Sequence, residues 1–201
     1  MSTIEKDLPS IISNSQEVTL HLSQSIFLVS IGVNDYTTNY LINFKGTWTG
    51  YTPEAFGDFL LNEFFIRMQR LYHLGARKFV VNAAYPVGWA PYYVANGTRA
   101  KEINQQIQYF TTRVPREARR AAVEVCRFFV HCFTDVRRPC CPADGNATSF
   151  CEPNMAVCED RKKYMFLDGG HTTESANGIL AQECFSGTLC KPNIIELVKA
   201  P

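Results

Sequence analysis

Two short apolar runs on either side of a long helical segment constrain the fold of this chain most strongly. Residues 25–31 (SIFLVSI) and 78–84 (KFVVNAA) are almost continuously apolar and rich in β-forming side chains, a pattern typical of strands buried on both faces of a parallel sheet. Between them, residues 53–74 carry aromatic and aliphatic side chains near helical spacing. Strand, helix and strand predict a βαβ unit with a right-handed crossover, and therefore an α/β fold.

Local signals set the ends of the predicted elements. Thr52-Pro53-Glu54 supplies a helix cap, a proline suited to the first turn and an acid, and Gly75 ends the helix. Residues 99–113 predict another helix, and residues 174–185 a helix near the C-terminus. Residues 116–133 are ambiguous, because they could begin as a helix while residues 127–133 (RFFVHCF) form a third strand. Neither an internal repeat nor a domain boundary is visible, so we expect one domain over residues 1–201.

Composition excludes several classes of partner. The chain has 201 residues, of which 46% are hydrophobic and 19% charged, as in globular proteins. A formal net charge of +1 gives no reason to expect nucleic acid or an anionic membrane as partner. Neither a membrane-spanning apolar run nor the apolar core of a signal peptide is visible in the sequence.

The cysteines point to an oxidising compartment. Six of the eight lie between Cys126 and Cys158, and four of these lie in a loop-like stretch rich in Pro, Asp, Gly and Asn. Such clustering predicts disulfides, in a pairing that the sequence leaves undetermined. Zinc is the alternative, although no C-x-x-C pair is present and His131 is the only nearby histidine. Two glycosylation sequons, at Asn96 and Asn146, also favour secretion.

The strongest candidate for chemistry is Asp168-Gly169-Gly170-His171, which follows the apolar stretch 164–167. An Asp three residues before a His at such a turn can accept a hydrogen bond from the imidazole Nδ1, which leaves Nε2 to take a proton from a nucleophile. The alternative is a loop with a surface Asp and a helix-capping His. A second candidate, Gly32-Val33-Asn34-Asp35, follows the first strand at the end where open α/β sheets bind ligands.

Four blocks in this order resemble the plant-type GDSL esterases/lipases of the SGNH hydrolase superfamily. They are SIFLVSIGVNDY, LYHLGARKFVVNAAYPVGWAP, CCPADGNATSFC and YMFLDGGHTTESAN, with Trp89 where the family usually has cysteine and Thr172 where proline is common. The resemblance implies a flavodoxin-like three-layer α/β/α sandwich. It also implies that Asp168 and His171 belong to a catalytic triad, that Asn34 donates to an oxyanion hole, and that Gly32 allows the turn that aims Asn34.

The resemblance also shows what this chain lacks. The family's nucleophilic serine lies in a G-D-S block, followed by a glycine block that supplies a backbone oxyanion donor, and neither block is present. No serine here has a Gly-Asp-Ser context, and this holds for each candidate replacement, namely Ser23, Ser25, Ser30, Ser149, Ser175 and Ser186. We therefore expect no nucleophile, a domain that lacks its first strands, and little or no esterase activity. Residues 25–31 would then form an exposed edge strand that promotes aggregation or pairing with another chain.

Three hypotheses follow. The first is an incompletely represented GDSL-type esterase/lipase that hydrolyses carboxylic esters of acyl lipids or acetyl esters by a Ser-His-Asp mechanism. The second is a non-catalytic relative that binds a lipid, glycan or protein partner, and the third is a partial or misjoined gene product without stable function. No metal or other cofactor is expected. The family implies an extracellular protein, whereas a chain truly starting at Met1 would stay in the cytosol with reduced cysteines.

Overall fold

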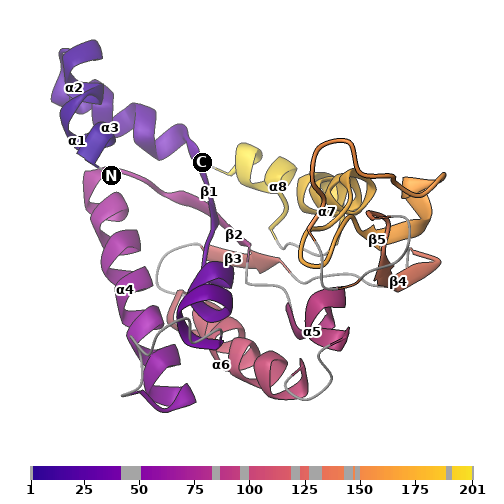
Figure 1. Ribbon diagram of the computed structural model, residues 1–201. Helices are drawn as coiled ribbons and strands as arrows, with labels where there is room; N and C mark the ends of the chain where they lie inside the picture. The colour runs from indigo at the N-terminus through magenta and orange to yellow at the C-terminus, as the bar shows by residue number, and fades with distance from the viewer. Residues whose placement is uncertain are drawn as a thin grey trace.

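A computed structural model describes residues 2–41, 51–82, 87–95, 100–118, 123–126, 133–142, 147, 150–188 and 192–200. Its central sheet has three parallel strands in the order β1-β2-β3, namely β1 (Ile26–Ser30), β2 (Lys78–Asn82) and β3 (Val123–Cys126). Figure 1 shows α4 (Pro53–Leu74) and α6 (Ala100–Ala118) on one side of this sheet, and α7 (Glu174–Ser186) and α8 (Ile194–Lys199) on the other. The α/β fold with helices in two outer layers is confirmed.

The predicted βαβ unit is present with nearly the expected bounds. The Thr52 hydroxyl accepts a hydrogen bond from Ala55 N at 3.2 Å and caps α4 at its start. Gly75 ends the helix with φ of 122°, a backbone conformation that glycine adopts without a steric penalty. β1 and β2 then pair in parallel, with Phe27 opposite Phe79.

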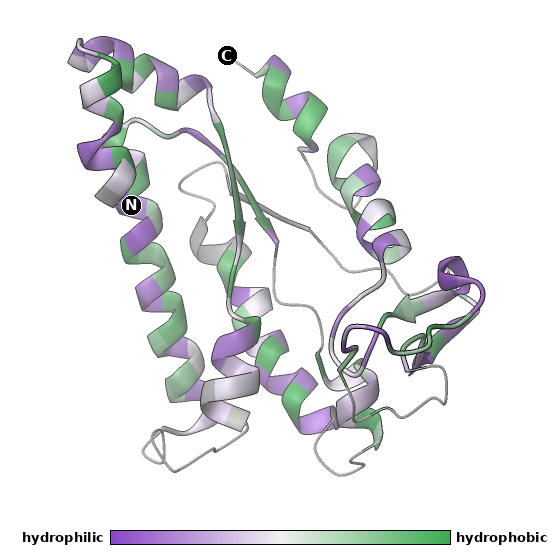
Figure 2. Ribbon diagram, turned by 45° about the horizontal axis from the view of Figure 1, so that its top comes forward, coloured by the Kyte–Doolittle hydropathy of each residue, from purple (hydrophilic) through white to green (hydrophobic). Residues whose placement is uncertain are grey.

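Alternating side chains of β2 divide the core between the two faces of the sheet. Phe79 and Val81 belong to the larger cluster with α4 and α6, whereas Val80 packs with Cys184 of α7 and Leu197 of α8. In Figure 2 the two strands are green between helices on which green and purple alternate, as expected for amphipathic helices around a buried sheet. The buried members of the larger cluster are Tyr36, Phe56, Leu61, Phe64, Met68, Ala76, Phe79, Val81, Val87, Ile103, Ile107, Phe110 and Val114.

The prediction that both strands are buried on both faces is confirmed for β2 and is wrong for β1. The three central residues of β2 are buried, but Leu28 in the middle of β1 is 63% exposed. The reason is that β1 lies at the edge of the described sheet and its Leu28 face borders a cavity instead of a packed helix. The expectation that residues 25–31 form an edge strand therefore agrees with the described sheet.

The third strand lies earlier in the chain than residues 127–133. β3 comprises Val123–Cys126 and pairs with β2 in the register Phe79 opposite Val123, while residues 127–132 lie outside the described part. The preceding helix, α6, also continues beyond residue 113 to Ala118. Val114 is fully buried in the core, so burial extends past the predicted end of the helix. The strand is thus placed by pairing with β2, which sequence periodicity did not reveal.

The remaining elements lie at the two ends of the chain and around the sheet. The N-terminal segment forms α1 (Ser2–Lys6), α2 (Leu8–Ile11) and α3 (Ser15–Gln24). Short helices follow the first two strands, namely η1 (Asp35–Leu41), η2 (Val87–Trp89) and α5 (Pro91–Ala95). A separate pair of parallel strands, β4 (Asp135–Pro139) and β5 (Tyr164–Phe166), lies with η3 (Arg161–Lys163) near α7.

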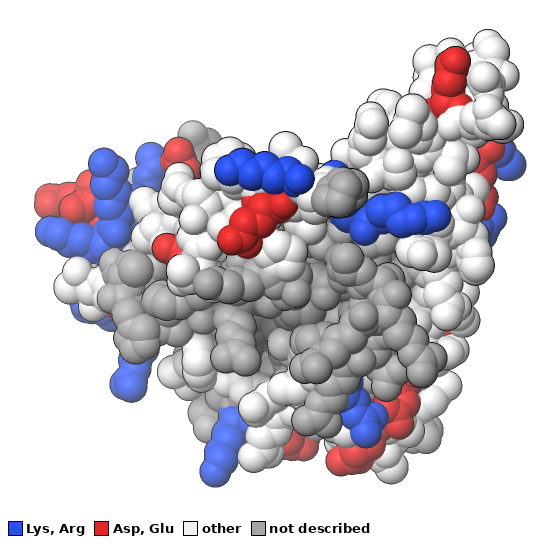
Figure 3. All heavy atoms as spheres, turned by 180° about the vertical axis from the view of Figure 1, so that it is seen from behind, with Lys and Arg blue, Asp and Glu red and all other residues white. Residues whose placement is uncertain are grey.

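Charged side chains of both signs occur on the described surface. On the face shown in Figure 3, Lys and Arg side chains are interspersed with Asp and Glu side chains. This distribution accords with the formal net charge of +1. Within the described ranges, no helix combines the length and the apolar character that crossing a membrane requires.

Candidate active site

The Asp168–His171 turn is a tight loop between β5 and α7. Leu167 N donates to His171 O at 2.7 Å, and Thr173 N donates to Met165 O at 2.9 Å, so the chain reverses direction across the turn. The Thr173 hydroxyl accepts from Ala176 N at 3.2 Å and caps α7. The helix cap is therefore Thr173, and the interpretation of His171 as a capping residue is wrong.

Asp168 is buried and fully engaged, which also contradicts the interpretation of a surface carboxylate. It is 3% exposed, and its Oδ1 accepts from Gly170 N at 2.9 Å and His171 N at 2.8 Å. Its Oδ2 accepts from Cys151 N at 3.2 Å. Burial acts to raise the pKa of Asp168, but the hydrogen bonds from Gly170, His171 and Cys151 together hold that pKa below its ordinary value. The carboxylate is thus kept ionised.

The imidazole of His171 takes the orientation that the sequence predicted. Its Nδ1 lies 2.9 Å from Oδ2 and 3.0 Å from Oδ1 of Asp168. Because an ionised carboxylate only accepts hydrogen bonds, Nδ1 carries the proton and Nε2 presents a lone pair. The side chain of His171 is 70% exposed, whereas that of Asp168 is 5% exposed. A buried anion therefore orients an accessible imidazole, which is the arrangement required of a general base.

Two aromatic residues beside the imidazole were not predicted from the sequence. The Phe150 ring lies 5.7 Å from that of His171, and it also stacks on Tyr92 with ring centroids 6.4 Å apart and an interplanar angle of 19°. Tyr92 N also donates to Gly169 O at 2.9 Å, which joins α5 to the turn. The available signal was Phe150 itself, a large apolar side chain directly before Cys151 in the cysteine loop.

Two disulfides fasten the cysteine loop next to the turn. Cys140 pairs with Cys158 and Cys141 with Cys151, so the prediction of disulfides is confirmed and the pairing that the sequence left undetermined is resolved for these four cysteines. These four cysteines bind one another and are not ligands for zinc. Among the described residues, no cluster of three or more His, Cys, Asp or Glu side chains has the arrangement of a metal site. The two sequons, 96–98 and 146–148, fall on stretches that are not fully described.

Asn34 lies on a different segment from Asp168 and His171. It follows β1 and Gly32, whose φ of 104° agrees with the predicted need for glycine at this turn. The side chain of Asn34 is exposed, and its carbonyl accepts from the Thr38 hydroxyl at 2.6 Å.

The helix α5 links these two segments. A hydrogen bond joins the side chains of Thr37 and Tyr93, and the neighbouring Tyr92 contacts the turn at Gly169. Over the described residues, no hydrogen bond connects Asn34 directly with Asp168 or His171, so its predicted role stays a prediction.

The hydrogen bonds of the His171 imidazole bear on the expected lack of a nucleophile, which stays a prediction. No hydroxyl or thiol in the described ranges forms a hydrogen bond with its imidazole. Ser30 is the last residue of β1, and Ser175 lies in the first turn of α7, as the sequence predicted. Ser149 lies outside the described residues.

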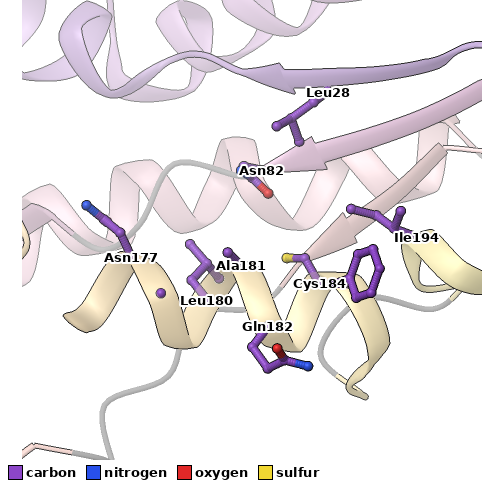
Figure 4. Close-up of a pocket in the computed structure, with 10 residues that line it drawn as sticks. Leu28, Asn82, Asn177, Leu180, Ala181, Gln182, Cys184 and Ile194 are labelled. Carbon is purple, nitrogen blue, oxygen red and sulfur yellow. The ribbon is translucent and has the colours of Figure 1, made fainter. Parts of the chain in front are cut away.

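An apolar cavity of about 590 Å³ lies between the sheet and α7. Figure 4 shows Leu28 of β1 and Asn82 of β2 on one side, with Leu180, Ala181 and Cys184 of α7 on the other. Asn177, at one end of the cavity, accepts a hydrogen bond from the Thr172 hydroxyl at 2.8 Å. Asn177 is therefore a lining residue that also binds the residue after His171, whereas Asp168, His171 and Thr172 do not line the cavity.

Comparisons with known protein sequences identify a family of relatives. The sequence model described as GDSL-like Lipase/Acylhydrolase matches residues 2–184. GDSL esterase/lipase 7 of Arabidopsis thaliana is 31% identical, over 92% of this chain and 58% of that protein. From the same plant, GDSL esterase/lipase At1g71691 is 30% identical, over 83% of this chain and 49% of that protein. A third, GDSL esterase/lipase At1g33811, is 29% identical over 86% of this chain and 54% of its own length. The chain thus spans about half the length of the curated relatives it matches.

Proposed function

Because this chain belongs to the GDSL-like lipase/acylhydrolase family, we propose that Asp168 and His171 are the acid–base pair of a carboxylic ester hydrolase. The observation that carries the proposal is the pairing of a buried, ionised carboxylate with the Nδ1 of an exposed imidazole. The substrates are small-molecule esters, either acyl lipids or acetyl esters.

In the proposed mechanism a serine hydroxyl attacks the ester carbonyl. His171 Nε2 takes the hydroxyl proton and later gives it to the leaving alcohol, while Asp168 stabilises the imidazolium between these steps. A water molecule then attacks the acyl-enzyme by the same route and releases the acid. The Asn34 amide donates to the carbonyl oxygen as negative charge develops there, a contribution of about 3 kcal/mol to the barrier for one such donor.

The serine that starts this mechanism is not among the residues of this chain, which contains no G-D-S block. We propose that the polypeptide alone is weakly active or inactive. A serine hydrolase that lacks a triad member retains only about 10³–10⁴-fold catalysis over water, and here the glycine block that supplies a backbone oxyanion donor is missing as well. The complete activity requires a segment that carries the nucleophile block.

The test is hydrolysis of p-nitrophenyl acetate by the purified chain and by a chimera in which a relative's N-terminal segment, with its G-D-S block, precedes it. We expect background hydrolysis from the chain, and turnover from the chimera that His171→Ala abolishes. The control is His73→Ala, because His73 is an exposed histidine at the end of α4. His171-dependent turnover by the chain alone would show that it contains a nucleophile. A chimera that folds but stays inactive would refute the role of the Asp168–His171 pair.

The cavity favours a second candidate, a non-catalytic relative that binds a lipid. Its lining is mostly apolar, and Leu28, Leu180, Phe185 and Ile194 are large enough to contact an acyl chain. Titration with a fluorescent fatty acid tests this function. Binding that Leu180→Lys removes and His171→Ala leaves unchanged would support it, whereas absence of binding would refute it.

We also propose an extracellular location for the protein in which this sequence functions. Two disulfides are expected to persist only in an oxidising compartment. Thiol labelling of the protein taken directly from the source tissue tests this location. Labelling of Cys140 and Cys151 before any reduction would refute it.

A further inference from the structure

We infer that the Phe150–Cys151 segment is the positioning element of the Asp168–His171 pair, and that the Cys141–Cys151 disulfide holds this segment in place. The inference deepens the proposed function, because it assigns residues that act through the pair. Phe150 and Cys151 are positioning residues and not catalytic ones.

Cys151 supplies the long-range hydrogen bond to the buried carboxylate. Gly170 N and His171 N donate to Oδ1, and they belong to the same turn as Asp168. These two hydrogen bonds are therefore local to the turn. Cys151 N is separated from Asp168 by 17 residues and donates to Oδ2 at 3.2 Å. Oδ2 is also the oxygen 2.9 Å from Nδ1 of His171. The Cys151 amide therefore fixes the oxygen that orients the imidazole, and it helps to hold the pKa of Asp168 low.

The second contact of the segment is the one between the Phe150 ring and the imidazole. Its ring lies 5.7 Å from the ring of His171, tilted by 59°. A Cβ atom built at Gly170 would lie 3.2 Å from the Phe150 ring, so the ring rests directly on the turn. The ring is nevertheless 52% exposed, which is unusual for a phenylalanine that serves only the core. Its position is better explained by contact with His171.

The disulfide joins this segment to the backbone directly before Asp168. Cys141 N donates to Leu167 O at 2.6 Å, so Cys141 is bound to the residue directly before Asp168. Its sulfur is bonded to Cys151. The amide donor and the carboxylate that accepts from it are therefore fastened to the same short stretch of backbone, and loss of the cross-link releases one from the other.

The second disulfide provides a matched control in the same loop. Cys140 and Cys158 pair across 18 residues, compared with 10 for Cys141 and Cys151. In the described structure neither Cys140 nor Cys158 forms a hydrogen bond with Asp168 or His171. Because the longer loop loses more chain entropy on closure, removing the Cys140–Cys158 bond should destabilise the fold at least as much. A purely structural role thus predicts an equal or larger effect in the control.

The experiment is NMR of the full chain with ¹⁵N-labelled histidine and ¹³C-labelled aspartate. The tautomer of His171 is read from its two ring nitrogen shifts, and the protonation of Asp168 from the pH titration of its carboxyl carbon. The variants are Cys141→Ser with Cys151→Ser, Cys140→Ser with Cys158→Ser, and Phe150→Ala. In the parent chain we expect the Nδ1–H tautomer.

In the Cys141/Cys151 variant we expect loss of the Nδ1–H tautomer and a higher titration midpoint for Asp168. In Phe150→Ala we expect loss of the same tautomer, and in the Cys140/Cys158 variant both signals unchanged. Retention of the Nδ1–H tautomer in the Cys141/Cys151 variant would overturn the inference, and so would its loss in both disulfide variants alike. Should the Cys141/Cys151 variant fail to fold, Phe150→Ala tests the inference, because removal of a half-exposed ring leaves the core intact. Retention of the Nδ1–H tautomer in Phe150→Ala would then overturn it.

These signals need no turnover, so they separate this inference from the proposed function. An inactive chimera whose His171 tautomer still depends on Phe150 would refute the catalytic role and leave the positioning role standing. An active chimera in which the His171 tautomer is unchanged by Phe150→Ala and by loss of the Cys141–Cys151 bond would support the catalytic role and refute the positioning role.

Discussion

Replacement of Asp168 by asparagine tests how strongly the turn depends on a buried anion. Asparagine keeps one carbonyl oxygen that can accept from Gly170 N and His171 N. Its NH₂ group, however, would face Cys151 N and Nδ1 of His171. All three of these groups are hydrogen-bond donors, so both hydrogen bonds to Oδ2 are lost. A hydrogen bond to a charged acceptor contributes about 1.5–3 kcal/mol. The exposed imidazole can turn to water, so only the loss at Cys151 counts in full. We expect Asp168→Asn to lower the free energy of unfolding by about 2 kcal/mol at pH 7.

The pKa of Asp168 determines how the stability difference between the parent and Asp168→Asn changes with pH. The folded-state pKa of Asp168 lies below its ordinary value, and the unfolded value is about 3.9. A carboxyl with a depressed folded pKa contributes stability that is complete above the unfolded pKa and is lost as pH falls through the folded pKa. The difference between the parent and Asp168→Asn should therefore be constant from pH 7 to about pH 5 and shrink below about pH 4.

Urea unfolding followed by circular dichroism at several pH values measures this difference. Asp160→Asn is the control, because asparagine can still cap η3 through Lys162 N and only an exposed 3.7 Å ion pair with Lys163 is lost. That variant should change the free energy of unfolding by less than about 0.5 kcal/mol. Equal effects of the two substitutions, or a difference that persists unchanged into acid, would refute the assignment of Asp168 as a buried ionised group.

Three further predictions concern other parts of the chain. Thr173→Ala removes a hydroxyl that accepts from Ala176 N and donates to Tyr164 O at 2.8 Å. It should therefore lower the free energy of unfolding by about 1–2 kcal/mol, and Thr173→Ser should lower it by less, because serine keeps the hydroxyl. Equal losses by calorimetry would contradict the capping role. Tyr36→Phe should raise the free energy of unfolding by about 1 kcal/mol, because the buried hydroxyl has no partner among the described residues and burial raises its pKa so that it stays neutral. A lower stability in urea would contradict this expectation. Leu28→Lys should reduce self-association in sedimentation velocity at a stability cost below about 0.5 kcal/mol, since Leu28 is 63% exposed on an edge strand. A parent chain that sediments as a single monomer would show that the edge does not drive association.

The sequence alone determined the features that depend on neighbouring residues. Helix α4 with Thr52 at its start and Gly75 at its end, the strand β2, and the turn of Asp168 and His171 all follow from local periodicity, capping and glycine placement. The spacing of Asp168 and His171 allowed their hydrogen bond but left a surface loop as the alternative, and it was the resemblance of the surrounding blocks to a known family that favoured the hydrogen bond.

Only the tertiary structure decided which distant segments meet. The partner of Cys141, the amide of Cys151 against Asp168, and the ring of Phe150 against His171 join residues that no periodic pattern relates. The same is true of β3, whose position was set by pairing with β2, and of Leu28, whose exposure follows from its edge position. A hydrophobic pattern indicates whether a segment tends to be buried. Which segments become its neighbours depends on how all segments pack together. The contacts of Cys151 with Asp168 and of Phe150 with His171 could therefore be seen only in the folded chain.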